Sequence, residues 1–119
     1  MPRQMQCLPV PPGSTSTRTL QPDLRTAADM FVRFLTSLGF HVVVTSTLRS
    51  LDTQRALYEN AQRGCSRYPA AAPGKSRHGT GRAFDLHLDP PQYDVAGAIW
   101  EAIGGTWGGR FSDPIHFEG

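Results

Sequence analysis

The strongest constraint on the fold is a change from a helical to a strand-like pattern at residue 39. Over residues 23–38, apolar side chains follow the three-four spacing of one helix face, which predicts a helix with Asp23 as N-cap and Gly39 as terminator. The apolar positions of this face are Leu24, Ala27, Ala28, Phe31, Phe34, Leu35 and Leu38. Residues 40–47 are rich in β-branched side chains, which predicts a short buried strand directly after the helix.

The second half of the chain also alternates between helical, irregular and strand-like segments. Ser50 or Asp52 can cap a second helix that runs to about residue 63, and its inward positions would be Leu51, Ala56, Leu57 and Ala61. Residues 65–81 are rich in proline and glycine and predict a loop, residues 82–88 alternate like a strand, and residues 93–103 predict a third helix. The strands are too few for a doubly wound sheet. We therefore predict an α+β fold, a small single domain with a short, mostly antiparallel sheet and about three helices around it.

The length of 119 residues suits one domain. Proline, serine and threonine crowd its start, so we divide the chain into an extended arm, residues 1–22, and a folded domain, residues 23–119. A formal net charge of +2 is too small to predict a nucleic-acid surface, and no apolar run is long enough to cross a bilayer. We expect a monomer that binds no nucleic acid and does not insert into membranes.

The first residues, MPRQ, lack the apolar stretch of a secretory signal, which predicts synthesis in the cytoplasm. Cys7 and Cys65 could pair as a disulfide. In a chain without an export signal, however, two cysteines predict reduced thiols with a structural role.

Side chains that can bind a metal are concentrated in the second half of the chain: His78, Asp85, His87, Asp89, Asp113, His116 and Glu118. A catalytic zinc ion typically takes three protein ligands from histidine and carboxylate, and its fourth position stays open to water. His78 and Asp85 can supply two ligands, because the glycines between them allow a tight turn and the following strand returns toward His78. His116 would supply the third. Taken singly, each residue has an ordinary explanation as a surface histidine or a turn aspartate.

Three sequence blocks resemble one family of enzymes. The string SRHGTGRAFD, residues 76–85, matches S-x-H-x-x-G-x-A-x-D at all five specified positions. This resembles the zinc peptidases that include D-alanyl-D-alanine carboxypeptidases and phage L-alanyl-D-glutamate endopeptidases. Residues 45–58 are similar to the family's strand-end Arg-Ser followed by Gln and Leu-Tyr, and WGG at residues 107–109 precedes D-x-x-H at residues 113–116.

The resemblance implies that His78, Asp85 and His116 hold zinc at the edge of the sheet, and that Asp113 is the general base. Because Pro114 disfavours a regular helix, we expect the side chains of Asp113 and His116 to project into one cavity.

The remaining roles concern the substrate and the surroundings of the metal. We expect Arg49, at a strand end, to bind the oxyanion or a substrate carboxylate, and Ser76 and Gln54 to bind the peptide. Glu118 is a candidate partner of His116, and Trp107 is expected to pack beneath the site. His41 and His87 are interpreted as structural or exposed. Leu48 stands where many members have an aromatic residue, which leaves the specificity open.

The implied function is zinc-dependent hydrolysis of the stem peptides of bacterial peptidoglycan. The WGG to D-x-x-H ending favours the L-alanyl-D-glutamate bond, as in phage endolysins, with action on the periplasmic side of the cell wall after release or delivery. Two alternatives remain open. One is a D-alanyl-D-alanine carboxypeptidase, and the other is a non-catalytic zinc-containing module that binds the wall.

Overall fold

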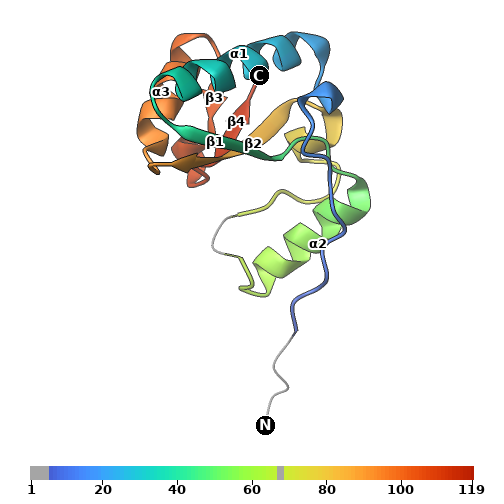
Figure 1. Cartoon of the computed structure of the whole chain (residues 1–119). Coiled ribbons are helices and arrows are strands. Elements are labelled where there is room, and N and C mark those ends of the chain that lie inside the picture. The colour runs from blue at the N-terminus through green and yellow to red at the C-terminus, as the bar shows by residue number, and fades with distance from the viewer. Residues whose placement is uncertain (1–5, 67–68) are drawn as a thin grey trace.

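A computed structural model describes residues 6–66 and 69–119, in which a four-stranded sheet carries two helices on one side and a third helix stands apart on the other side (Figure 1). The helices are α1 (Pro22–Ser37), α2 (Leu51–Gln62) and α3 (Tyr93–Ala102), and the strands are β1 (His41–Ser46), β2 (Ala83–Asp89), β3 (Thr106–Trp107) and β4 (His116–Glu118). Short 3₁₀ helices are η1 (Thr17–Thr19), η2 (Arg77–Thr80) and η3 (Gly108–Phe111). The strand order is β1-β2-β4-β3, and all neighbours are antiparallel. The predicted α+β class and mostly antiparallel sheet are confirmed.

Strand alternation divides the sheet into a core face and a site face. Successive side chains of a strand point to opposite faces, so Phe84 and Phe117 face α1 and α3 while Asp85 and His116 face the other way. The core between sheet and helices is built from Leu20, Leu24, Ala28, Phe31, Leu35, Phe40, Phe84, Leu86, Leu88, Ala96, Trp100 and Phe117. Aromatic rings at its centre pack edge to face, as between Phe84 and Trp100.

Helix α1 confirms the predicted element but begins one residue earlier. Pro22 opens the helix, because its fixed φ suits the first helical position, and Gln21 is the N-cap in place of Asp23. Gly39, with φ 99°, ends the helix as predicted. Phe34 and Leu38, expected to be inward, are 49% and 52% exposed because they lie beside the narrow stripe that contacts the sheet.

Two further burial predictions are wrong. The strand over residues 41–46 is not fully buried, since β1 is an edge strand with one open face and Val43 is 42% exposed. Ser50 caps α2 as predicted, its hydroxyl accepting a hydrogen bond from the Thr53 amide, but Leu51 is 60% exposed. Helix α2 stands apart from the sheet (Figure 1), so Leu51 does not reach the hydrophobic core, although Thr53 and Gln54 of the same turn are buried.

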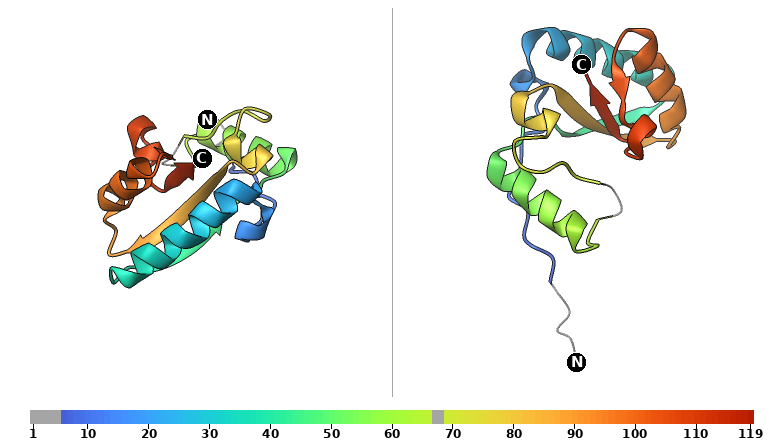
Figure 2. Two further views of the ribbon diagram at one scale, coloured as in Figure 1. Left: turned by 90° about the horizontal axis from the view of Figure 1, so that it is seen from above. Right: turned by 180° about the vertical axis from the view of Figure 1, so that it is seen from behind.

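The described part of the arm runs beside α2, as the view from behind in Figure 2 shows. We call residues 7–14 the strap. Asn60 of α2 donates to the Leu8 carbonyl and accepts from the Leu8 amide, at 2.9 and 2.6 Å. Thr53 donates to the carbonyl of Pro11. At its far end, Ser14 exchanges backbone hydrogen bonds with residues 47 and 48 just after β1.

The prediction of reduced thiols is wrong, because Cys7 and Cys65 form a disulfide with Cα atoms 6.0 Å apart. The expectation rested on the cellular compartment alone, whereas pairing depends on the path of the backbone. The strap folds back along α2 and brings together two cysteines that are 58 residues apart in sequence. Within the described ranges, no helix has the length and apolarity needed to span a membrane.

We expect the double variant Cys7→Ser/Cys65→Ser to lower the free energy of unfolding by about 2–4 kcal/mol, because the cross-link closes a long loop in the unfolded chain. Chemical denaturation of the oxidised wild type and the variant measures the difference. Dithiothreitol should bring the wild type to the stability of the variant and leave the variant unchanged. Equal stability of all samples would contradict the prediction.

Candidate metal centre

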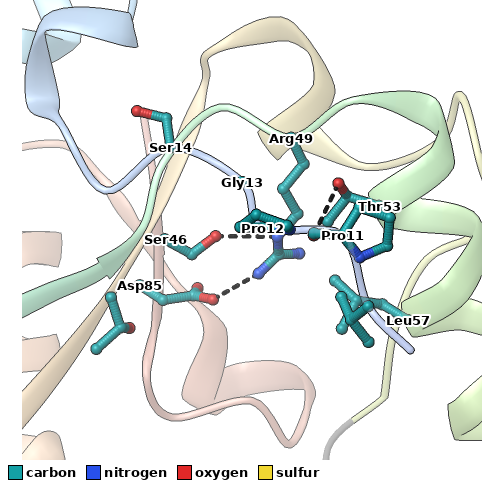
Figure 3. Close-up of a pocket in the computed structure, with 11 residues that line it drawn as sticks. Pro11, Pro12, Gly13, Ser14, Ser46, Arg49, Thr53, Leu57 and Asp85 are labelled. Atoms are coloured by element: carbon teal, nitrogen blue, oxygen red, sulfur yellow. Dashed lines mark hydrogen bonds and ion pairs between the residues drawn. The ribbon is translucent and has the colours of Figure 1, made fainter. Parts of the chain in front are cut away.

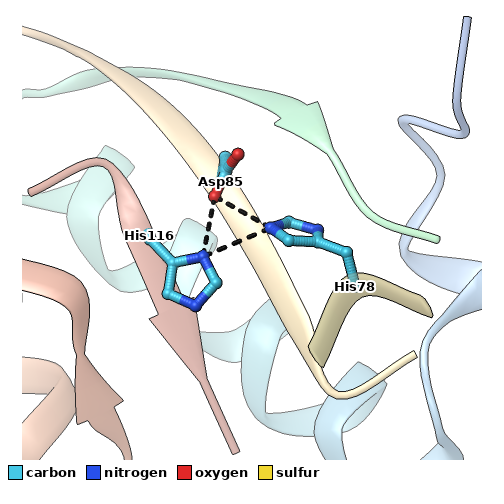
Figure 4. Close-up of side chains that lie close together, drawn as sticks. All are labelled: His78, Asp85 and His116. Carbon is cyan, nitrogen blue, oxygen red and sulfur yellow. Dashed lines mark hydrogen bonds and ion pairs between the residues drawn. The ribbon is translucent and has the colours of Figure 1, made fainter. Parts of the chain in front are cut away.

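Two inner strands and a 3₁₀ helix bring together the three predicted metal ligands. Asp85 of β2 lies directly opposite His116 of β4 in the antiparallel register. His78 lies on η2, which is capped by Ser76 and ends at Gly81 with φ 70°, so the chain turns at once into β2. His78 Nε2, His116 Nδ1 and Asp85 Oδ1 lie 3.2 Å from one another (Figure 4). All three residues are buried.

The outer hydrogen bonds of the two histidines fix which ring nitrogen faces the centre. His78 Nδ1 is 2.7 Å from the Thr47 carbonyl, which can only accept, so this nitrogen carries the proton. His116 Nε2 is 2.9 Å from the Glu118 carboxylate, so it too is the donor. When the rings are neutral, they direct two lone pairs at each other and at the Asp85 carboxylate, which is repulsive. Burial would lower the pKa of His116, but its hydrogen bonds with Asp85 and Glu118 outweigh burial and raise it, so a shared proton or a bound cation relieves the repulsion.

The spacing and chemistry of this group fit a tetrahedral metal ion. Zinc binds histidine nitrogen and carboxylate oxygen at about 2.0–2.1 Å, and the edge of a tetrahedron with such bonds is about 3.3 Å long. The observed separations of 3.2 Å match that edge. Three protein ligands leave one tetrahedral position for water or substrate, which is the pattern of catalytic rather than structural sites.

Arg49 holds the second oxygen of Asp85. Its guanidinium donates to Asp85 Oδ2 at 2.8 Å and to Ser46 Oγ at 2.9 Å (Figure 3). It also donates to Gln54 Oε1 at 3.3 Å. Burial alone would raise the pKa of Asp85, but hydrogen bonds with His116 and His78 and the charge of Arg49 outweigh it and hold the pKa well below its usual range. Asp85 is therefore anionic at neutral pH and ready to bind a cation.

The WGG segment packs against the loop that carries Asp113 and His116. A Cβ atom on Gly108 would lie 2.3 Å from the Asp113 carbonyl oxygen and 2.7 Å from His116 Cβ, so only glycine allows this approach. The indole N–H of Trp107 donates to the Pro114 carbonyl at 2.8 Å. The half-buried Trp107 ring packs against Gly97 of α3, which fixes this loop to the core.

Asp113 faces the metal group from this loop. Its carboxylate lies 3.9 Å from His116 Nδ1. Burial and then the negative charge of Asp85 raise the pKa of Asp113 to about 6 in the metal-free protein, against the opposing effect of the two histidines and Arg49. A carboxyl group with this pKa can accept and return a proton near neutral pH.

The metal group opens into a cavity of about 180 Å³, here called the metal cleft. Arg49, Gln54, Ser76 and Asp113 all line it, so the structure places the four predicted catalytic and substrate-binding residues around the ligands. Gln54 and Ser76 also have local contacts. Gln54 donates to the Ala71 carbonyl, and the Ser76 hydroxyl accepts from the His78 amide. Their roles toward substrate stay predictions.

The predicted contact of Glu118 with His116 is confirmed, and His41 and His87 are exposed. Two contributors were missed by the sequence analysis. The Thr47 carbonyl orients His78, and the Ser46 hydroxyl orients Arg49. A main-chain carbonyl leaves no signal in a sequence, but the serine near a strand-end arginine could have been considered.

Comparison with solved structures shows the class of fold. Vancomycin-resistance D,D-dipeptidase VanXYg, solved with a D-Ala-D-Ala phosphinate analogue, has a TM-score of 0.64 and 23% identity, over 83% of this chain and 49% of its own. The LD-carboxypeptidase LdcB has a TM-score of 0.65 and 20% identity, over 90% of this chain and 70% of its own. The L-Ala D-Glu endopeptidase ChiX of Serratia marcescens has a TM-score of 0.57 and 25% identity, over 86% of this chain and 81% of its own.

The chain shares its fold with these three peptidases, although it spans only about half the length of VanXYg. The sequence profile of VanY, D-alanyl-D-alanine carboxypeptidase, matches residues 17–102. The chain therefore belongs to the VanY family, and the resemblance seen in the sequence is confirmed. No curated protein matches the sequence.

We expect Glu118→Gln to weaken metal affinity by about 10- to 100-fold, because the oxygen of a neutral amide is a weaker acceptor than a carboxylate for the hydrogen bond from the His116 ring. Competition with a chromophoric chelator measures the affinity. Glu101→Gln is the matched control, since Glu101 pairs with Arg110 on the surface. If the two variants bound the metal with equal affinity, Glu118 would not support His116 as a metal ligand.

The metal-free protein should show Asp113 titrating near pH 6 by carbon-detected NMR. Because this pKa lies above the ordinary value of 3.8, the contribution of Asp113 to stability is full below about pH 3.8 and is lost as the pH rises through about 6. Asp113→Asn should remove that part of the pH dependence. A carboxyl resonance that titrates near pH 4 would contradict the raised pKa.

Proposed function

We propose that this chain is a zinc-dependent peptidase that hydrolyses the L-alanyl-D-glutamate bond of peptidoglycan stem peptides. The observation that carries the proposal is the convergence of two imidazole lone pairs and one carboxylate beside a second, proton-accepting carboxyl. Zinc held by His78, Asp85 and His116 would polarise the scissile carbonyl and lower the pKa of water.

The proton transfers fall to Asp113. Its carboxylate accepts a proton from the water that attacks the scissile carbonyl carbon. As the C–N bond breaks, the protonated carboxyl donates that proton to the leaving amine. In the metal-free protein the pKa of Asp113 is raised to about 6, so neither protonation state is strongly disfavoured near neutral pH. A bound cation lowers this pKa and favours the proton-accepting form.

Arg49 orients the metal ligand Asp85 and can also bind the substrate. Its three hydrogen bonds to Asp85, Ser46 and Gln54 use three of its five N–H groups. Two further N–H groups can donate to the oxygen that becomes negative as the carbonyl is attacked. We assign Ser76 and Gln54 to the peptide backbone, as the sequence predicts.

Two observations support the L-alanyl-D-glutamate bond. One is the WGG segment followed by D-x-x-H. The other is the likeness to ChiX, an L-Ala D-Glu endopeptidase, since the match extends over 81% of the ChiX chain. The family profile favours a second candidate, a D-alanyl-D-alanine carboxypeptidase. Mass spectrometry of purified peptidoglycan digested by the protein separates them. The first predicts new free amino groups on D-glutamate, and the second predicts release of terminal D-alanine.

We further propose the context in which the enzyme works. It acts as a monomer on the periplasmic side of the cell wall, in the manner of a phage endolysin. Lysis of chloroform-treated cells by the purified protein, together with its mass in solution, tests this assignment.

Asp113→Ala should bind zinc with at most a small change and lose hydrolysis by about 10²- to 10⁴-fold, since it removes the proton acceptor and none of the ligands. His116→Ala should lose zinc, because a ligand is missing. Elemental analysis and stem-peptide cleavage measure the two properties. If Asp113→Ala retained full hydrolysis, the general-base assignment would fail. A zinc-loaded wild type without hydrolysis would favour the non-catalytic module.

A further inference from the structure

Residues 47–49, which follow β1, hold two of the three metal ligands from outside. We call them the support segment. The Thr47 carbonyl accepts the hydrogen bond from His78 Nδ1 at 2.7 Å, and the Arg49 guanidinium donates to Asp85 Oδ2 at 2.8 Å. The Arg49 amide also donates to the His78 carbonyl at 3.1 Å. A shift of the support segment would therefore displace the outer partners of both ligands at once.

The support segment belongs to no helix or strand, and the strap supplies hydrogen bonds to its backbone. The Thr47 amide donates to the Ser14 carbonyl at 2.8 Å, and the Ser14 amide donates to the Leu48 carbonyl at 3.0 Å. The buried Thr47 side chain has a second partner, since its hydroxyl oxygen lies 2.9 Å from that of Thr19. The path of residues 47 and 48 is thus fixed by a part of the chain that is about 30 residues away in sequence.

The strap also packs directly on the arginine of the support segment. A Cβ atom on Gly13 would lie 3.2 Å from the Leu48 carbonyl oxygen and 3.4 Å from Arg49 Cγ, so the strap backbone lies against this side chain (Figure 3). At its other end, the strap is fixed to α2 by the disulfide and by the paired hydrogen bonds with Asn60. These anchors do not involve the support segment, so the strap can hold that segment in place.

We propose that Gly13 and Ser14 are positioning residues of the metal centre, which act on His78 and Asp85 through the support segment. The inference rests on the metal binding that the proposed function requires, but not on hydrolysis. Loss of a group that orients a metal ligand typically weakens metal affinity by about 10- to 100-fold, and we expect the lower end of this range for groups one step further out. The family profile matches residues 17–102, so the strap lies outside the matched region.

Proline substitutions in the strap test the proposal. Ser14→Pro removes the amide that donates to the Leu48 carbonyl. Val10→Pro is the matched control, because the Val10 amide forms no backbone hydrogen bond within the described part of the chain. Gly13→Val is a second variant, which keeps the Ser14 amide but places a branched side chain between the strap and the support segment.

The measurements separate positioning from a general loss of stability. Competition with a chromophoric chelator gives the zinc affinity of each variant. Hydrogen exchange of the Thr47 amide, followed by NMR in the metal-free protein, reports directly on its bond to the strap. Ile99→Ala serves as a stability control, since it removes part of a side chain that packs against the core from α3, away from the strap.

Ser14→Pro and Gly13→Val should each weaken zinc affinity about 10-fold and speed the exchange of the Thr47 amide about 10-fold. Val10→Pro should match the wild type in both, and Ile99→Ala should lower Tm with zinc affinity unchanged. If Ser14→Pro and Gly13→Val bind zinc no more weakly than the two controls, the strap does not position the ligands, and the proposed function stands. If the wild type binds no zinc, the proposed function and this inference both fail.

Discussion

The structure depends on three electron-pair donors that face one another at the end of two inner strands. His78, Asp85 and His116 are buried, with their ligand atoms 3.2 Å apart. The hydrogen bonds to the Thr47 carbonyl and to Glu118 keep a proton on the outer nitrogen of each ring, so a neutral ring has no proton on the nitrogen that faces the centre. Without a cation, proton sharing within the group must relieve this repulsion. Much of the surrounding architecture, from the Thr47 carbonyl to Glu118 and Arg49, serves to keep these three atoms in place.

The sequence predicted which three side chains come together, because part of their spacing reflects local structure. A turn with two glycines followed by a strand brings His78 near Asp85, and the approach of Asp113 and His116 depends on Gly108. These are short-range geometric requirements, and they leave fixed residue types at fixed intervals. The three helices and strands β1 and β2 were predictable for the same reason, since hydrophobic periodicity is a local property. Strands β3 and β4 were not predicted, because two and three residues are too short to show a period.

What the sequence could not show depends on contacts between distant segments. The exposure of Val43 follows from the position of β1 at the edge of the sheet, which no pattern within residues 41–46 reveals. The exposure of Leu51 follows from α2 standing apart from the core, and the disulfide follows from the strap folding back along that helix. Each depends on where a neighbouring segment lies, and chain topology decides this.

The position of β4 between β2 and β3 has a consequence for assembly in the cell. Strand β3 pairs with β4, and His116 enters the ligand set only when β4 has added to β2. A nascent chain whose residue 116 is still inside the ribosome has at most two of the three ligands and an incomplete sheet. An ion that is bound by all three residues can therefore be held only after β4 has paired with β2.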